Sequence, residues 1–164
     1  HHGLKPETYV LSIKKEESLE FVARQLNISA GVEVVFIKRL RFVDGWPVVI
    51  QQSYLPYSLF KGLEFRMKEL EERSLHSIIE QDYHYTLLTA ERTVEAIPAP
   101  FREAELLKIA QGSPVLYSTS VWQAVDGSVV EYVLEWYRGD RSQFKIQLER
   151  KDRVSGTHST KPSL

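Results

Sequence analysis

Cysteine is absent from this chain of 164 residues, which excludes disulfide bonds and thiol catalysis. No apolar run approaches the roughly 18 residues that a membrane span needs, and no signal peptide is visible, so we expect a cytoplasmic protein without membrane contact. The formal net charge is only −1, so the composition does not mark a nucleic-acid-binding domain. The sequence also lacks a glycine-rich phosphate loop, a serine nucleophile elbow and a histidine pair with metal-ligand spacing. We therefore expect neither a metal nor another cofactor.

What is present fits a single folded domain. Hydrophobic residues make up 43% of the chain, enough for a sizeable core at this length. Residues 1–3 resemble the remnant of a purification tag and no initiator methionine precedes them, so we interpret the chain as a fragment of a longer protein. We expect the domain to occupy residues 4–150 and a flexible tail, rich in Ser, Thr, Lys and Pro, to occupy residues 151–164.

The same short pattern is written twice along the chain. Each copy has an Ala-x-x-Leu-x-Ile-x-x-Gly stretch, a strand-like run, a Val-Asp-Gly turn and a second strand-like run. In the first copy 13 positions separate Gly31 from Asp44, and in the second 14 positions separate Gly112 from Asp126. The repeat predicts two helix–hairpin units in one pseudo-symmetric α+β domain. Because the polar residues that interrupt the strands differ between the copies, we expect a ligand site at those positions.

Apolar periodicity and turn residues predict the elements of this domain. The predicted strands cover residues 8–14, 33–42, 48–54, 86–96, 115–124, 129–137 and 143–148. The predicted helices cover residues 18–27, 58–72 with a break at Gly62, 74–81, and 100–109, with Ser18 and Ser74 as N-caps. Hairpin connections imply a largely antiparallel sheet with the helices on one face. We interpret the Arg-Gly-Asp-Arg stretch at 138–141 as a structural turn.

Two arginines stand on one face of the second predicted strand. Val35, Ile37, Arg39 and Arg41 form one row, because side chains two positions apart in a strand share a face. Two neighbouring guanidinium groups repel each other unless an anion lies between them, and their geometry matches phosphate or carboxylate. The alternative is an exposed strand end where each arginine meets an acidic residue of a neighbouring strand.

The face occupied by Gln51 depends on the turn that precedes its strand. A two-residue Asp-Gly turn pairs Gln51 with Lys38 and places it opposite to Arg39. A three-residue turn starting at Val43 pairs it with Ile37 and places it on the Arg39 face. We favour the second register, although Gln51 is equally interpretable as an ordinary solvated strand residue.

The remaining candidates lie on a helix start and on the last hairpin. Ser74 opens a helix whose free N–H groups favour an anion, although a serine there more often caps its own helix. His76 follows on the same helix, and a lone histidine is usually a surface or partly buried residue. Glu131 and Tyr137 share a strand face with Val129. Glu131 either accepts hydrogen bonds from ligand hydroxyl groups or pairs with an arginine.

Taken together, several segments resemble the UTRA domain, the effector-binding domain of HutC-type GntR transcription regulators. The resemblance covers about residues 5–150, and the order and spacing of its motifs carry it. These motifs are Arg-Leu-Arg at 39–41, Asp-Gly-Trp-Pro at 44–47, Ser-Tyr-Leu-Pro at 53–56, Ser-Leu-His at 74–76, Asp-Gly-Ser-Val-Val-Glu-Tyr at 126–132 and Arg-Gly-Asp-Arg at 138–141.

The resemblance implies a chorismate-lyase-like α+β fold with a pocket for a small-molecule effector. It also implies a homodimeric repressor whose N-terminal winged helix-turn-helix, absent from this chain, binds operator DNA, and it implies no enzymatic activity. In family members that sense phosphorylated amino sugars, the strand arginines and the serine that opens the helix hold the phosphate. These residues match Arg39, Arg41 and Ser74.

The same family members hold the sugar with an acidic residue and a later tyrosine, which match Glu131 and Tyr137. Two positions depart from the family pattern, because Gln51 stands where an acidic residue is usual and His76 where a tyrosine is usual. An amide both donates and accepts hydrogen bonds, whereas an ionised carboxylate only accepts. The resemblance therefore favours a phosphorylated or otherwise anionic sugar over an amino sugar specifically.

Two other functions are compatible with the sequence. A chorismate-lyase-like enzyme shares the fold and would use Arg39, Arg41 and Glu131 to hold carboxylates and to protonate a leaving group. A dimerisation module with a closed pocket would need none of these residues for ligand binding. The regulator-like motifs favour the effector-sensing domain over both.

Overall fold

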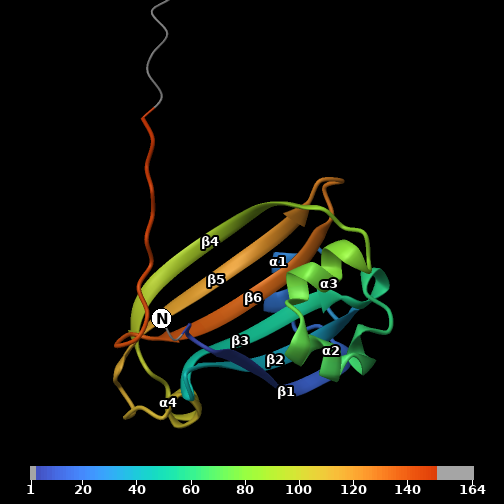
Figure 1. Ribbon diagram of the computed structural model, residues 1–164. Coiled ribbons are helices and arrows are strands. Elements are labelled where there is room, and N and C mark those ends of the chain that lie inside the picture. The colour runs from blue at the N-terminus through green and yellow to red at the C-terminus, as the bar shows by residue number, and fades with distance from the viewer. Residues whose placement is uncertain (1–2, 151–164) are drawn as a thin grey trace, which may run out of the picture.

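A computed structural model describes residues 3–150 and contains one six-stranded antiparallel sheet with the strand order β1-β2-β3-β6-β5-β4 (Figure 1). The strands are β1 (Pro6–Glu17), β2 (Glu33–Val43), β3 (Trp46–Pro56), β4 (Leu87–Pro98), β5 (Pro114–Ala124) and β6 (Val129–Arg138). The helices are α1 (Glu20–Leu26), α2 (Met67–Glu72), α3 (Leu75–Gln81) and α4 (Phe101–Leu107), with 3₁₀ turns η1 (Tyr57–Leu59) and η2 (Leu63–Phe65). The predicted α+β class is confirmed.

The sheet consists of two β-α-β-β halves that meet in its centre. The first half is β1-α1-β2-β3 and the second is β4-α4-β5-β6, and the antiparallel pair β3–β6 joins them. Gln51 of β3 lies opposite Glu135 of β6 at this junction. The predicted repeat is confirmed, and each unit also includes the strand that precedes its helix.

The two repeated helices end in the same way. Asn27 after α1 and Lys108 after α4 both adopt left-handed backbone conformations, with φ of 56° and 54°. Their N–H groups return to carbonyls in the last turn of each helix, which satisfies acceptors that a helix C-terminus leaves free. Gly31 and Gly112 then turn the chain into the next strand with φ of 85° and 84°.

The first hairpin corrects the predicted register of Gln51. Asp44 and Gly45 both have positive φ, so the turn has two residues, and a bulge at Val48 follows it. The extra residue of the bulge pairs Gln51 with Arg39. The predicted face is therefore confirmed, but both predicted pairings, with Lys38 and with Ile37, are wrong.

A matching bulge in the second hairpin changes the face of Val129. Trp122 pairs with Glu131 whereas Gln123 pairs with Val129, which leaves Val130 as the extra residue. Val129 consequently packs into the core on the opposite face from Glu131. The expectation that Val129 shares a face with Glu131 is wrong, because a bulge breaks the strict alternation of side chains.

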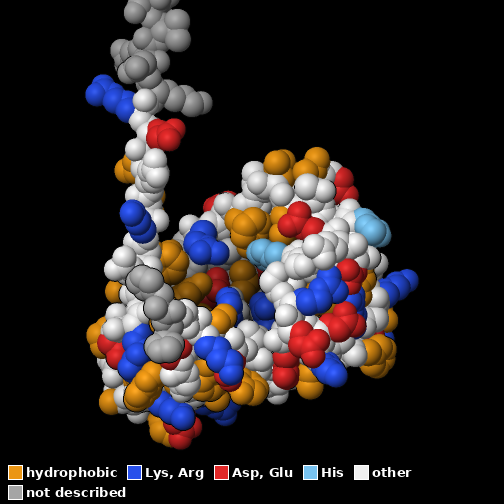
Figure 2. All heavy atoms as spheres, in the orientation of Figure 1, with side chains coloured by type: hydrophobic (Ala, Val, Ile, Leu, Met, Phe, Trp, Pro, Cys, Tyr) orange, Lys and Arg blue, Asp and Glu red, His pale blue; other side chains and the backbone are white. Residues whose placement is uncertain are grey.

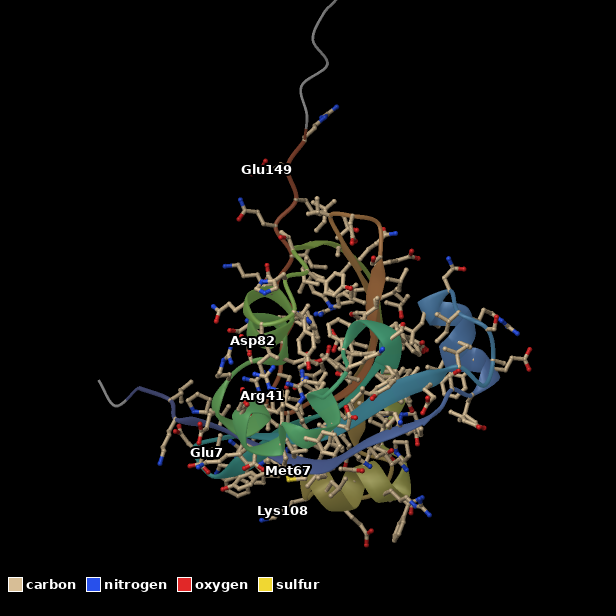
Figure 3. The ribbon with its side chains drawn as sticks, turned by 90° about the vertical axis from the view of Figure 1, so that its right-hand side faces the viewer. Glu7, Arg41, Met67, Asp82, Lys108 and Glu149 are labelled. Atoms are coloured by element: carbon tan, nitrogen blue, oxygen red, sulfur yellow. The ribbon has the colours of Figure 1, made fainter. Side chains whose placement is uncertain are left out.

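Helices cover both faces of the sheet, so the expectation of helices on one face is wrong. One core lies between the sheet and the helices α1 and α4, and the other between the sheet and the segment 57–85 (Figures 1 and 3). The first core is built around Val22, Leu26, Val34, Ile50, Leu107 and Trp136. The second is built around Val35, Ile37, Leu55, Phe60, Leu70 and Ile78. Both faces of the sheet are apolar enough to bury a layer.

Two local predictions fail. Ser18 does not cap α1, since Leu19 occupies that position, and the Ser18 hydroxyl lies 3.5 Å from the carbonyl of Ser29. Residues 143–148 form no strand, because the chain leaves the sheet after β6 and runs without a partner strand (Figure 1). The predicted tail at 151–164 and the first two residues lie outside the described part of the chain.

The segment 138–141 is a structural turn, as predicted. Arg138 donates to both carboxylate oxygens of Asp140, at 3.0 and 2.7 Å, and to the Leu107 carbonyl at 3.2 Å. A Cβ at Gly139 would lie 2.5 Å from the carbonyl oxygen of Pro114, so no larger residue fits without a backbone shift. This turn fixes the end of β6 to α4 and to the start of β5.

Candidate functional site

A polar hollow lies between α3 and the centre of the sheet. Figure 2 shows basic and acidic side chains at its floor and a histidine at its edge. A cavity of about 200 Å³ is lined there by Arg39, Gln51, His76, Arg92, Trp122, Glu131, Val133, Glu135 and Tyr137. A second cavity of about 210 Å³ extends from it toward α2, with Arg39, Arg41 and Ser74 in its wall. Arg39 lines both cavities, so the two adjoin, and we call the first the inner cavity and the second the outer cavity.

Arg39 is the most unusual residue of this site. Its side chain is buried, with 8% of the residue exposed, and its Nε has no hydrogen-bond partner. Within residues 3–150, no carboxylate lies within 4.0 Å of either Arg39 or Arg41, so the alternative of ion pairs with neighbouring strands is not supported. Burial lowers the pKa of Arg39 more than the negative charge of Glu131 raises it. A buried guanidinium without an ion pair is costly and favours an anionic partner.

Other unsatisfied polar atoms surround Arg39 on the same face of the sheet. The described residues contain five buried side-chain atoms without hydrogen-bond partners. Four of them share this face and belong to Arg39, Gln51, Ser53 and Ser118. Each such atom costs about 1–3 kcal/mol of desolvation, which a bound polar ligand can offset. Their concentration on one face identifies the polar hollow as a candidate binding site.

Glu135 occupies the floor of the hollow. Its Oε2 accepts hydrogen bonds from Gln51 Nε2 at 2.7 Å and from the Tyr137 hydroxyl at 2.6 Å. Burial, with the neighbouring Glu135 charge, raises the pKa of the Tyr137 phenol, which therefore remains a neutral donor. Gln51 thus donates its amide N–H to Glu135. A carboxylate at position 51 would instead be repelled by the charge of Glu135.

Glu131 and His76 connect the sheet to α3. His76 Nε2 donates to Glu131 Oε1 at 2.7 Å, and its ring packs edge-on against Trp122 at 4.7 Å between centroids. Burial acts to raise the pKa of Glu131, but the hydrogen bond and charge of His76 outweigh it and lower that pKa. Burial likewise acts to lower the pKa of His76, and Glu131 outweighs it, so that pKa is raised. Each partner thus favours the ionised form of the other.

Ser74 and Arg41 form the outer part of the site. The Ser74 hydroxyl accepts from the N–H of Ser77 at 3.0 Å and caps α3, as predicted. Ser74 and Arg41 are both exposed in the wall of the second cavity. Arg41 lies beside the layer formed by α2 and α3 in Figure 3. The neighbouring Arg73 also lines this outer cavity, and its guanidinium is held by Asp82 at 2.9 and 3.0 Å.

The hollow brings together all seven site residues that the sequence predicts. Arg39, Gln51, His76, Glu131 and Tyr137 line its inner cavity, while Ser74 and Arg41 line the outer one with Arg39. Whether each residue contacts a ligand stays a prediction.

Four residues that line the inner cavity were missed, namely the apolar Val133 and the residues Glu135, Trp122 and Arg92. Glu135 shares the strand face of Glu131, so alternation alone contained the signal for it. Trp122 and Arg92 lie on β5 and β4, and only the strand order places them beside Glu131 and Glu135. Arg39 on β2 and Arg92 on β4 have three strands between them in the sheet, and no pattern in the sequence predicts that they line the same cavity.

A larger cavity of about 780 Å³ adjoins the hollow at the ends of β2 and β3. It shares Arg41 and Tyr137 with the site and is otherwise lined largely by residues 42–49 and 140–144. None of the orphaned polar atoms belongs to its lining. We therefore assign polar recognition to the hollow around Arg39.

Two properties limit the chemistry of the described chain. Among residues 3–150, no group of three or more His, Cys, Asp and Glu side chains is arranged to hold a metal ion. In the same range, no helix has both the length and the apolar character required to cross a membrane.

The fold and the polar hollow define the class of an effector-binding domain, and comparison with known proteins gives the family. Residues 1–143 match the UTRA domain, and the chain belongs to this family. It is the UTRA effector-binding domain of a GntR/HutC-family transcriptional regulator, with the chorismate-lyase-like fold that the resemblance implied.

Two curated relatives are transcriptional repressors. The mannosyl-D-glycerate transport/metabolism system repressor MngR of Escherichia coli is 26% identical over 132 residues, covering 80% of this chain and 54% of its own length. The HTH-type transcriptional repressor NagR of Bacillus subtilis is 26% identical over 148 residues, covering 90% of this chain and 60% of its own. The chain thus spans little more than half of these relatives. They are regulators, so the expectation of a regulator in place of an enzyme is confirmed.

Solved structures show the same fold. The effector domain of PhnF from Mycobacterium smegmatis superposes with a TM-score of 0.83 at 24% identity, covering 90% of both chains. A transcriptional regulator from Streptomyces coelicolor superposes with a TM-score of 0.82 at 29% identity, covering 90% of this chain and 97% of that one. These two proteins therefore share the fold of this chain.

Proposed function

We propose that this domain senses a small anionic metabolite, most simply a phosphorylated sugar, and that the metabolite controls DNA binding by a winged-helix domain elsewhere in the full protein. The observation that carries this proposal is Arg39, a buried guanidinium with an unpartnered Nε beside a second arginine. A phosphate supplies the charge and the acceptor oxygens that this arrangement lacks.

The remaining residues take complementary roles. Arg41 and the Ser74 hydroxyl lie in the outer cavity with Arg39 and complete the anion site. Glu131, Glu135 and Gln51 face the inner cavity, where carboxylates accept hydrogen bonds from sugar hydroxyl groups and the amide both donates and accepts. Tyr137 and His76 line the same cavity.

The regulatory step follows from the position of α3. Ser74 and His76 belong to the start of α3, and His76 ties that helix to Glu131 on β6. A ligand that contacts both α3 and the sheet favours the conformation in which both sets of contacts form. It can shift the regulator between two conformations only if it binds these conformations with different affinities. We propose a cytoplasmic homodimer, because paired DNA-binding heads read two-fold operators.

A thermal-shift screen tests this function. Phosphorylated sugars, their unphosphorylated parents and small carboxylic acids are added to the wild-type domain, to Arg39→Met and to the control Arg102→Ala. Arg102 is exposed on α4, away from the site. A ligand at a hundred times its dissociation constant adds about 2.7 kcal/mol of stability.

The proposal expects a shift with a phosphosugar, none with its parent, loss in Arg39→Met and retention in Arg102→Ala. A shift that survives in Arg39→Met contradicts the role of Arg39. A shift only with an unphosphorylated acid retains the sensor but contradicts the phosphosugar. No shift with any compound contradicts the sensing function.

A further inference from the structure

Arg92 is a cation of the polar hollow that neither the family motifs nor the sequence analysis assign. It lies on the edge strand β4, and its side chain reaches over β5 into the inner cavity. Its Nε donates to the Ser120 hydroxyl at 2.8 Å, which fixes the orientation of the guanidinium. One Nη lies 3.8 Å from Glu135 Oε1, an ion pair too long to be a hydrogen bond. Most of its five N–H donors are thus available.

The position of Arg92 relative to Arg39 gives it a separate role. The strands that carry them, β4 and β2, lie on opposite sides of the central pair β3–β6. Both guanidinium groups line the same cavity, with Gln51 and Glu135 hydrogen-bonded to each other between them. The hollow therefore has a cation at each end and hydrogen-bonding groups in the middle. A ligand that fills it meets a positive charge at both ends.

The charges of the hollow leave Arg92 without a close anionic partner. The outer cavity carries acids as well as arginines, since Glu71 and Glu72 line it beside Arg41. In the inner cavity Glu131 is already matched by His76, and Glu135 is satisfied at Oε2 by neutral donors. Among the described residues, the one carboxylate within 4.0 Å of Arg92 is that of Glu135, at 3.8 Å. Arg92 can therefore take a second anion from a ligand.

The other half of the domain shows that an arginine is not needed at this position for folding. The matching residue on β1 is Val10, which pairs with Arg39 as Arg92 pairs with Ser120. Val10 is buried under the inserted helices, with its N–H bonded to Glu71. No helix covers β4, whose side chains are nearly all exposed. The arginine on β4 therefore points into open space above the hollow instead of into a core.

We propose that Arg92 binds a carboxylate at the far end of the ligand, so that the effector is a phosphorylated sugar acid. This inference rests on the proposed function, since it takes the phosphate to lie at Arg39 and Arg41. The alternative is that Arg92 only balances the charge of Glu135, in which case it contributes equally to every ligand.

Two probes that differ only at one end separate these cases. 6-Phosphogluconate and glucitol 6-phosphate share the carbon chain, the phosphate and the internal hydroxyl groups, but the end opposite the phosphate is a carboxylate in the first and a hydroxymethyl group in the second. Isothermal titration measures both probes, and inorganic phosphate, with the wild-type domain and the variants Arg92→Met, Arg92→Lys, Arg39→Met and Arg102→Ala. Methionine keeps an unbranched apolar stem like that of arginine but has no guanidinium group.

We expect the wild-type domain to bind 6-phosphogluconate about tenfold or more tightly than glucitol 6-phosphate, in line with one charge-assisted pair. Arg92→Met should remove this preference and leave the affinity for glucitol 6-phosphate within about threefold, since that probe gives Arg92 no carboxylate. Arg92→Lys should restore part of the preference, because lysine keeps the charge but not the fork. Arg102→Ala should match the wild type.

Two results would overturn the proposed role of Arg92 without contradicting the proposed function. One is equal affinity of the wild-type domain for both probes, and the other is an equal loss for both in Arg92→Met. A failure of the proposed function looks different, because the wild-type domain then binds neither probe nor inorganic phosphate, or Arg39→Met binds them unchanged.

Discussion

The two β-α-β-β halves follow the same backbone path with different polar side chains. Their helices end in matching left-handed caps, and their hairpins carry bulges at matching positions, Val48 and Val130. In this alignment Arg39 corresponds to Ser120, because Arg39 lies opposite Gln51 and Ser120 opposite Val133. The first half thus provides a cation where the second provides a small hydroxyl.

The halves also differ in what covers them. The segment 57–85 inserts between them and packs onto β1 and β2 through η1, η2 and α2, while β4 has no such cover. The hollow forms where this cover ends, between α3 and the bare second half. The comparison teaches that the shared core fixes the backbone, whereas substitutions on one face and a one-sided insertion create the site.

The largest expected effect tests the equivalence of the halves. Leu26 and Leu107 end α1 and α4, and both are almost fully buried in one core. Leu26→Ala and Leu107→Ala should each lower the free energy of unfolding by about 2–5 kcal/mol, measured by urea denaturation. A loss confined to one of the two variants would contradict the symmetric core.

The next effect tests the difference between the halves. Arg39→Met should weaken binding of a phosphosugar by about 50-fold or more, whereas Ser120→Ala at the matching position should keep phosphate affinity within about threefold. The free energy of unfolding of unliganded Arg39→Met should not fall, because replacing a buried unpaired charge by an apolar side chain is often neutral or stabilising. Comparable losses of affinity in both variants would contradict a site built on one half.

A smaller effect concerns the repeated turns. Gly31→Ala and Gly112→Ala should each cost about 1 kcal/mol of unfolding free energy, since both glycines have positive φ and open space around the missing Cβ. Urea denaturation of the two variants tests this. A markedly unequal cost in the two variants would contradict the equivalence of the two turns.

The smallest effect is the pH dependence of the His76–Glu131 pair, which has no counterpart in the first half. The raised pKa of His76 contributes stability that is complete below its ordinary value of 6.5 and is lost as the pH rises through the raised pKa. The lowered pKa of Glu131 contributes stability that is present above 4.5 and is lost as the pH falls through the lowered pKa. The His76–Glu131 pair should therefore stabilise the domain most between pH 4.5 and pH 6.5.

Urea denaturation of wild type and His76→Asn from pH 5 to pH 9 measures this contribution. The difference in the free energy of unfolding between wild type and His76→Asn should be largest near pH 5.5 and should decrease toward pH 9. A difference that increases with rising pH would contradict an ionised His76–Glu131 pair.

Local patterns allowed much of this architecture to be predicted, while tertiary features were not accessible. The repeat, the hairpins and the shared face of Arg39 and Arg41 follow from spacing and alternation. The pairing of Gln51 depends on the bulge at Val48, which no turn signal marks. Arg92 enters the site only because β4 is the outer neighbour of β5.

The strand expected at 143–148 fails for a related reason. Its alternating pattern is genuine, with Phe144, Ile146 and Leu148 on one side, but a strand also needs a hydrogen-bonded neighbour. In the described chain this segment leaves the sheet and meets none (Figure 1). Helices on both faces were missed similarly, because sequence periodicity fixes which side of a helix is apolar but not which face of a sheet it covers.

The most direct test of the account is a crystal structure of the domain with the phosphosugar that gives the largest thermal shift. The account predicts the phosphate against Arg39, Arg41 and the Ser74 hydroxyl, with the sugar over Glu135. A phosphate bound instead in the larger cavity beside Phe144, with Arg39 still unpartnered, would contradict it.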